Sequence, residues 1–153
     1  NIGRLYQDPM RGTAPGMTAG IDGKSFSLLP VEIFYRETGK TKKVTEYPCD
    51  GKLLKAAEQV KTKYHTGRGV IGSGDEWNNQ LDRIALLRER YHTAVEDMES
   101  AAAAQLCLSY GVPFLGVRIL SNSIVNGEKF DEAVGIDGQK FMLSLVDQMR
   151  EYM

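Results

Sequence analysis

Apolar side chains recur at helical spacing in four stretches of the chain, and each stretch predicts an amphipathic helix. The helices are expected over residues 50–64, 78–91, 98–110 and 139–152. Asp50 is a residue type that caps a helix N-terminus, and Gly111 followed by Pro113 ends the third helix. In the second and fourth helices we expect inward stripes formed by Leu81, Ile84, Leu86, Leu87, Phe141, Leu145, Val146 and Met149. The charged residues of the second helix are expected to face solvent: Asp82, Arg83, Arg88, Glu89 and Arg90.

The segments between these helices contain the candidate strands. Residues 26–35 favour a strand that Pro30 interrupts, which indicates an edge strand or a break. A short strand is expected over residues 69–72, and a short apolar segment follows at 93–95. Residues 113–122 are nearly continuous in apolar side chains, which is typical of a central strand covered on both faces. The charged residues 37–48 and the glycine-containing residues 123–138 are expected to be connections. Alternation of strands with helices predicts an α/β fold with a mixed or parallel sheet.

Length and composition predict a single α/β domain over residues 1–153. Residues 1–25 show no period and are expected to be loop-like, packing on an N-terminal part outside the chain. The net charge of −1 argues against nucleic-acid and anionic-membrane partners, and no apolar run reaches the length of a spanning helix. Cys49 and Cys107 lack metal-ligand spacing, so no metal is expected. A reducing compartment is favoured over a disulfide between them.

Three carboxylates gather where the 93–95 segment meets the alanine-rich third helix. Glu96, Asp97 and Glu99, with Met98 between them, form what we call the acidic corner (residues 96–99). Acids in a first helical turn favour the positive end of the helix dipole, so capping is the simplest explanation. Three acids beside a methionine exceed the needs of a cap. We therefore interpret the acidic corner as the part of an active site that holds a sugar.

A glycine-rich turn follows the 69–72 strand, and Trp77 comes directly after it. Small residues allow the backbone to approach a ligand, but no Lys-Ser/Thr pair follows as a phosphate-binding loop requires. A lone tryptophan is more often part of a core. At the tip of this turn, beside Asn78, its flat ring is suited to stack on a planar base.

Polar residues interrupt the 113–122 strand near its carboxyl end, at Arg118, Ser121 and Asn122. Open α/β sheets bind ligands at the carboxyl ends of their strands. An arginine inside an apolar strand needs a partner, because burying a lone charge is costly. The simplest partner is an acid of the acidic corner, and such an ion pair would bring the two segments together.

Three motifs in a fixed order give the chain a resemblance to a known family. They are Ser73-Gly74-Asp75-Glu76-Trp77, then Val95 with Asp97-Met98-Glu99, then Val112-Pro113-Phe114 with Arg118-Ile119-Leu120-Ser121-Asn122. Together they resemble the nucleoside phosphorylase family, and within it the methylthioadenosine/S-adenosylhomocysteine nucleosidases. The resemblance extends from about residue 50 to residue 122 and continues toward the C-terminus. It implies a three-layer α/β/α fold with a mixed central sheet, of which this chain would be the later part.

The resemblance also implies roles in cleaving the N-glycosidic bond of a purine nucleoside to free base and sugar. Glu99 would accept hydrogen bonds from the ribose hydroxyls, and Met98 would pack against the sugar. Asp97 stands where the family has a glutamate and is one methylene shorter. Trp77 would lie against the base, and Asn78 beside it would contribute backbone contacts to the base edge.

The remaining roles fall at the end of the 113–122 strand. Arg118 matches the arginine near the attacking water or phosphate, and Ser121 matches the serine that orients the next residue. Asn122 departs from the nucleosidases, which have an aspartic acid that gives a proton to purine N7. An amide can donate a hydrogen bond but cannot transfer a proton. Asn122 therefore predicts altered activation of the leaving group, and it also suits 6-oxopurines.

The family's N-terminal half carries the glutamate that activates water, and no residue of this chain matches it. The resemblance implies no cofactor, a nucleoside substrate, a homodimer and a cytoplasmic location. Hydrolysis is the favoured reaction. Phosphorolysis of a 6-oxopurine nucleoside, with phosphate as second substrate, is the first alternative. The others are a nucleoside-binding relative that has lost the chemistry and an α/β domain whose acids only cap a helix.

Overall fold

The computed structural model describes residue 28, residues 30–75 and residues 77–150. The chain divides into two compact units, each built from two separate stretches. Unit 1 contains Asn1–Tyr47 and Gly69–Gly111, and unit 2 contains Pro48–Arg68 and Val112–Met153. The loop expected over residues 1–25 lies outside the described residues. The expectation of one domain stays a prediction, and the two units are described separately below.

The described part of unit 1 contains an antiparallel hairpin of β1 (Val31–Tyr35) and β2 (Lys40–Val44), in which Val31 lies opposite Val44. β1 starts directly after Pro30, which agrees with the predicted break. Gly39 forms part of the turn with a φ of 65°, a conformation that glycine adopts without steric cost. β2 falls within residues 37–48, which were predicted to be a connection, so that prediction is wrong. Four of its five side chains are exposed, and a strand of this kind carries no apolar alternation to reveal it.

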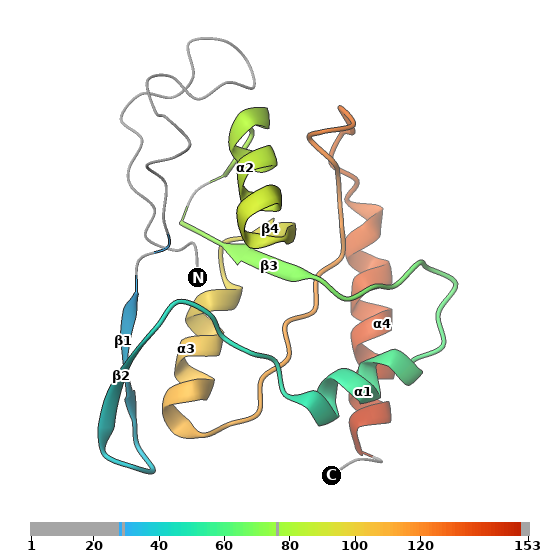
Figure 1. The fold of residues 1–153 in the computed structure, drawn as a ribbon. Coiled ribbons are helices and arrows are strands. Elements are labelled where there is room, and N and C mark those ends of the chain that lie inside the picture. Colours follow the sequence, from blue (N-terminus) through green and yellow to red (C-terminus); the bar gives the residue numbers. More distant parts are fainter. Residues whose placement is uncertain (1–27, 29, 76, 151–153) are drawn as a thin grey trace. The chain divides into compact units, whose positions relative to one another are not determined.

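The second sheet of unit 1 is a parallel pair, β3 (Val70–Ser73) and β4 (Thr93–Asp97), joined through α2 (Leu81–Tyr91). Figure 1 shows α2 between these two strands in the chain. Gly69 leads into β3 and passes so close to β4 that a Cβ atom on it would lie 2.5 Å from Ala94 Cβ. The close approach explains why a residue without a side chain stands at this position.

The α2 helix confirms part of its predicted pattern. Leu87 is almost fully buried and packs against Leu28, Leu86 and Tyr91. The prediction is wrong for two other residues, because Leu81 is 45% exposed and Arg83 is buried. The helix begins at Leu81 rather than at residue 78. Leu81 is therefore the first residue of the helix and lies at its exposed N-terminal end.

The α3 helix (Ser100–Tyr110) ends as predicted, at Gly111 with a φ of 68°. It begins two residues later than expected. Only part of its alanine run is buried, namely Ala101 and Ala104. Its later part is bound to the hairpin: the Arg36 amide donates to the Ser109 carbonyl at 3.0 Å, and the Ser109 hydroxyl donates to the Phe34 carbonyl at 2.6 Å.

Unit 2 is built around two helices, α1 (Gly51–Gln59) and α4 (Ala133–Arg150), which pack against each other. Asp50 caps α1 as predicted, because its carboxylate accepts from the Lys52 and Leu53 amides at 2.9 and 3.0 Å. Ala56 and Leu145 are fully buried. The structure corrects the predicted bounds: α1 ends at Gln59, before residue 64, and α4 starts six residues before 139. Val146, expected to face inward, is 45% exposed.

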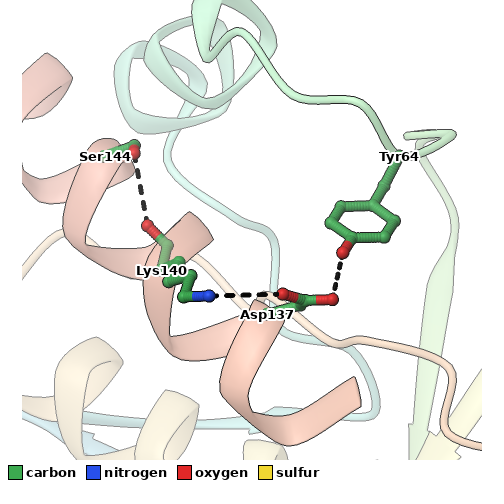
Figure 2. Close-up of polar contacts among 4 residues, drawn as sticks. All are labelled: Tyr64, Asp137, Lys140 and Ser144. Carbon is green, nitrogen blue, oxygen red and sulfur yellow. Dashed lines mark hydrogen bonds and ion pairs between the residues drawn. The ribbon is translucent and has the colours of Figure 1, made fainter. Parts of the chain in front are cut away.

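Polar contacts tie the chain after α1 to α4 (Figure 2). The Tyr64 hydroxyl donates to Asp137 Oδ2, and the Lys140 ammonium lies 3.8 Å from Asp137 Oδ1. The Ser144 hydroxyl donates to the Lys140 carbonyl at 3.2 Å. The Tyr64–Asp137 bond joins the segment that leaves α1 to α4, and the other two contacts lie within α4.

The strand predicted over residues 113–122 is not formed, and this is the largest correction to the sequence interpretation. The Phe114 carbonyl accepts from the Asp50 amide at 2.7 Å, and the Ser121 carbonyl accepts from the Asp131 amide at 3.1 Å. These are single bonds to loop and cap residues rather than a ladder. A central strand needs neighbouring strands on both sides, and the described part of unit 2 contains no strand.

The four helices and two small sheets of the described residues confirm the α/β class. One sheet is antiparallel and the other is parallel, so both kinds of strand pairing that a mixed sheet combines are present. No helix in the described part of the chain is both long enough and apolar enough to cross a membrane.

Candidate functional site

The carboxyl ends of β3 and β4 build the best-defined polar region of unit 1. Ser73 and Asp97 are the last paired residues of the two strands, and they lie opposite each other. The Gly74 amide donates to the Asp97 carbonyl at 2.9 Å, which extends the contact beyond the ladder. The buried Ser73 hydroxyl accepts from the Ala101 amide at 3.0 Å. The glycine-rich turn, the acidic corner and the start of α3 therefore meet at one edge, where parallel sheets bind ligands.

The three carboxylates of the acidic corner have different environments. Asp97 performs the capping role, because its carboxylate accepts from both the amide and the hydroxyl of Ser100, at 3.2 and 2.5 Å. Glu99 occupies the N-cap position of α3 but makes no side-chain capping bond. Its carboxylate accepts from the Met98 amide at 3.2 Å and is exposed. The capping explanation thus applies to Asp97 and leaves Glu99 facing solvent at the end of the strand.

The third carboxylate, Glu96, contacts the other side of the turn. Asn78 Nδ2 donates to both of its oxygens, at 2.9 Å to Oε2 and 3.2 Å to Oε1. The Asn78 side-chain oxygen accepts from the Gln80 amide at 3.2 Å. Sequence reasoning assigned Glu96 no role of its own beyond the acidic corner, and it did not predict this contact. No periodicity or motif pairs residues 18 positions apart, and only the folded turn reveals the pair.

Two large apolar side chains are exposed at this edge. Trp77 follows β3 by four residues and is 62% exposed, so it is not part of the core. Met98 directly follows β4 and is 46% exposed. Exposed aromatic and thioether groups next to a carboxylate are suited to contact the flat and apolar faces of a ligand.

Unit 2 contains the other three candidate residues. The Ser121 hydroxyl donates to the Asn122 side-chain oxygen at 3.2 Å, and both residues are half-buried. The Asn122 carbonyl is therefore an acceptor within the protein, and its NH2 group is the donor end of the side chain. Arg118 donates through Nη1 to the Val117 carbonyl at 2.8 Å. It is exposed, so the premise that Arg118 is a buried charge is wrong.

The predicted site residues thus divide between the units. Unit 1 contains the candidate residues that lie at or shortly after the ends of β3 and β4: Trp77, Asn78, Asp97, Met98 and Glu99. Unit 2 contains Arg118, Ser121 and Asn122. Within the described ranges, no group of three or more His, Cys, Asp or Glu side chains is arranged to hold a metal ion.

Comparison with known proteins identifies the family. A family model described as the Phosphorylase superfamily matches residues 15–149. The chain belongs to the Phosphorylase superfamily. This agrees with the α/β fold of the described residues.

Individual proteins of known name are also similar to this chain. The chain is 34% identical over 129 residues to the 5'-methylthioadenosine/S-adenosylhomocysteine nucleosidase of Bacillus pumilus, covering 77% of this chain and 55% of the relative. It is 32% identical over 125 residues to the protein of the same name from Aeromonas salmonicida, covering 77% and 54%. It is 30% identical over 114 residues to the protein of the same name from Geobacillus kaustophilus, covering 69% of this chain and 48% of the relative. The chain spans about half the length of these relatives.

Proposed function

We propose that this chain carries the ribose- and base-holding part of a nucleosidase that hydrolyses the N-glycosidic bond of a purine nucleoside. The substrate would resemble methylthioadenosine or S-adenosylhomocysteine, as the names of the relatives suggest. The supporting observation is the joined end of β3 and β4, where Glu99 is exposed beside Met98 while Asp97 caps α3. An acid that is not used for capping, at the ligand-binding edge of a parallel pair, is available to a substrate.

The proposed chemistry begins with the sugar. The Glu99 carboxylate accepts hydrogen bonds from two vicinal ribose hydroxyls, and Met98 covers the apolar side of the ring. Positive charge develops on the sugar as the bond to the base breaks. A carboxylate already oriented toward the hydroxyls stabilises that charge more in the transition state than in the ground state. Glu99 therefore contributes to rate as well as to binding.

The base is proposed to lie on the exposed Trp77 ring of unit 1. In unit 2, Asn122 is proposed to offer a hydrogen bond to N7 of a purine, as the family resemblance implies. The Ser121 hydroxyl donates to the Asn122 side-chain oxygen, so the amide NH2 is the end of the side chain that we propose as the donor to N7. A hydrogen bond stabilises negative charge developing on the leaving base without transferring a proton. Arg118 is proposed to lie near the attacking water.

Phosphorolysis of a 6-oxopurine nucleoside is the second candidate, and the identity of residue 122 favours it. An asparagine offers both a donor and an acceptor, which matches the N7 and O6 edge of a 6-oxopurine. In that reaction phosphate replaces water as the nucleophile, near Arg118. We also expect a homodimer in the cytoplasm, which sedimentation of the purified protein and cell fractionation would test.

The deciding experiment follows release of free base from methylthioadenosine, S-adenosylhomocysteine, adenosine and inosine, with and without phosphate. The proposal expects adenine release that does not depend on phosphate. Release that requires phosphate would replace the proposal with the phosphorolytic alternative. Binding seen as quenching of Trp77 without release from any nucleoside would show a non-catalytic relative. Neither binding nor release would exclude a nucleoside site.

Glu99→Gln tests the residue at the centre of the proposal. We expect kcat to fall by roughly 100-fold or more, because a neutral amide stabilises the developing charge far less. Glu89→Gln is the matched control, since Glu89 is an exposed glutamate on α2. Equal rates for Glu99→Gln and wild type would remove Glu99 from the site.

A further inference from the structure

Glu96 and Asn78 form a side-chain contact that the proposed reaction does not use. Both Glu96 oxygens accept from Asn78 Nδ2, at 2.9 and 3.2 Å, and Asn78 directly follows Trp77. We infer that Glu96 is a positioning residue, which acts through Asn78 to hold the Trp77 segment (residues 77–80) against β4. The inference rests on the proposed function for the role of Trp77, but the contact can be tested without substrate.

The Trp77 segment needs such an anchor because the Trp77 side chain is largely outside the core. Trp77 is 62% exposed, so core packing gives its ring little orientation. The segment is held at its far end, where Gln80 is buried and its carbonyl accepts from the Ile84 amide at 2.9 Å. Asn78 lies between this end and Trp77. Within the described residues 77–80, the bond to Glu96 is thus the side-chain hydrogen bond nearest to Trp77 along the chain.

Asn78 is fully engaged by the protein through both ends of its amide. Its NH2 group donates to Glu96, and its oxygen accepts from the Gln80 amide at 3.2 Å. A carboxylate acceptor makes the first of these bonds stronger than a bond between neutral groups. The Asn78 side chain is therefore an anchor and does not read the base. Base contacts from this segment fall to the Trp77 ring and to the backbone.

The position of Glu96 in β4 explains why two adjacent acids have separate duties. Successive side chains of a strand point to opposite faces. Asp97 contacts Ser100 at the start of α3, whereas Glu96 contacts Asn78 in the turn after β3. Glu99 follows two residues beyond the end of the same strand. One short strand thereby sets both the sugar-holding carboxylate and the platform for the base.

The first test is the fluorescence of Trp77, which is the single tryptophan of the chain. In Glu96→Ala without ligand, we expect lower steady-state anisotropy and a roughly twofold larger acrylamide quenching constant, because a released segment moves on the nanosecond scale. Asn78→Ala should have the same effect, and the double variant should add nothing, as for two partners of one bond. Glu96→Gln should stay close to wild type, since its amide oxygen can still accept. Glu89→Gln is the control.

The second test measures turnover. The inference expects Glu96→Ala to raise KM for the nucleoside by about fivefold, with kcat changed by less than about twofold, because the platform rather than the reacting groups is disturbed. Glu96→Gln should restore most of the loss. Unchanged anisotropy and quenching in Glu96→Ala would overturn the inference. If the wild type releases no base, the proposed function fails, and the fluorescence test still decides whether Glu96 holds Trp77.

Discussion

Two segments of the chain were expected to end in site residues at a sheet edge, and only one of them does so in the structure. The β3–β4 pair forms a parallel ladder whose end joins Ser73, Asp97 and the start of α3. Residues 113–122 were the stronger strand by composition, but in unit 2 they form no ladder, and single backbone bonds join the Phe114 and Ser121 carbonyls to the Asp50 and Asp131 amides. The difference shows that apolar content alone does not make a strand, because a strand also requires a neighbour with free backbone groups.

Amide hydrogen exchange is the most direct test of the difference between the β3–β4 pair and residues 113–122. We expect the ladder amides of β3 and β4 to exchange at least about 100-fold more slowly than the amides of residues 115–117, because the ladder amides donate to backbone carbonyls of the neighbouring strand. Peptides or resonances from α1 provide an internal reference for unit 2. Strong protection across residues 115–117 would show that this segment pairs as a strand in solution.

The second prediction concerns Asn122, near the end of residues 113–122. Asn122→Asp supplies an acid that can transfer a proton to N7, so we expect hydrolysis of adenine nucleosides to rise by about tenfold or more. The increase should be lost as the pH rises above the pKa of the new carboxyl group. Asn126→Asp, at an exposed position further along the chain, controls for the added charge. A rate equal to wild type would place residue 122 away from the leaving group.

The third prediction compares two glycines, one in each unit. A Cβ on Gly69 would lie 2.5 Å from Ala94 Cβ in the ladder, and neither backbone can easily yield. Gly69→Ala should therefore destabilise the protein by about 1–3 kcal/mol. In α4, a Cβ on Gly138 would meet the flexible end of Ile119, at 2.8 Å from Cδ1.

The effect of Gly138→Ala should be much smaller. Alanine gains about 1 kcal/mol of helix propensity over glycine, which offsets the cost of moving the Ile119 side chain. Urea unfolding of both variants measures the two free energies. Equal losses would contradict the view that the ladder is the more rigid of the two regions.

The fourth prediction concerns Asp50, the N-cap residue of α1, which also contacts residues 113–122. The Asp50 side chain caps the helix, and its amide donates to the Phe114 carbonyl. Asp50→Ala should reduce stability by about 1 kcal/mol, while Asp50→Asn should lose less, since asparagine is also a good N-cap residue. Thermal unfolding followed by circular dichroism provides the measurement. A larger loss for Asn than for Ala would argue against capping.

The smallest effect is expected from the ion pair between Glu58, at the end of α1, and Arg68, in the segment that follows it. The hydrogen bond from Arg68 lowers the pKa of Glu58 below its ordinary value of 4.5. A lowered pKa means that the pair stabilises the folded state above this value and loses its contribution as the pH falls through the folded-state pKa. Both groups are exposed, so the effect should be slight and reduced by salt. Comparing wild type with Glu58→Gln between pH 6 and about pH 3 tests the sign.

Features that depend on neighbours in the sequence were predicted well. Asp50 caps its helix, Pro30 precedes β1, and Gly111 ends α3 with a left-handed conformation. Each involves the backbone of a few adjacent residues, so the residue type alone carries the information. The α/β class was predicted for the same reason, since alternating local patterns define it.

Features that depend on distant partners were not predicted. β2 was missed because its exposed lysines and threonine have no apolar period, and it exists through pairing with β1. Arg83 was assigned to the outer face of α2 and is buried. The position of a charged side chain on a helix depends on what packs against that helix, and the sequence of the helix does not contain this information.

For the candidate site, the sequence by itself indicated the candidate residues: the acids and methionine of the acidic corner, Trp77 with Asn78, and Arg118, Ser121 and Asn122. Only the tertiary structure decided how the three acids divide their duties. Asp97 caps α3, Glu96 holds Asn78, and Glu99 stays exposed. The physical reason is that a carboxylate takes its role from the donors that folding brings within hydrogen-bond distance, and those donors come from other elements of the chain.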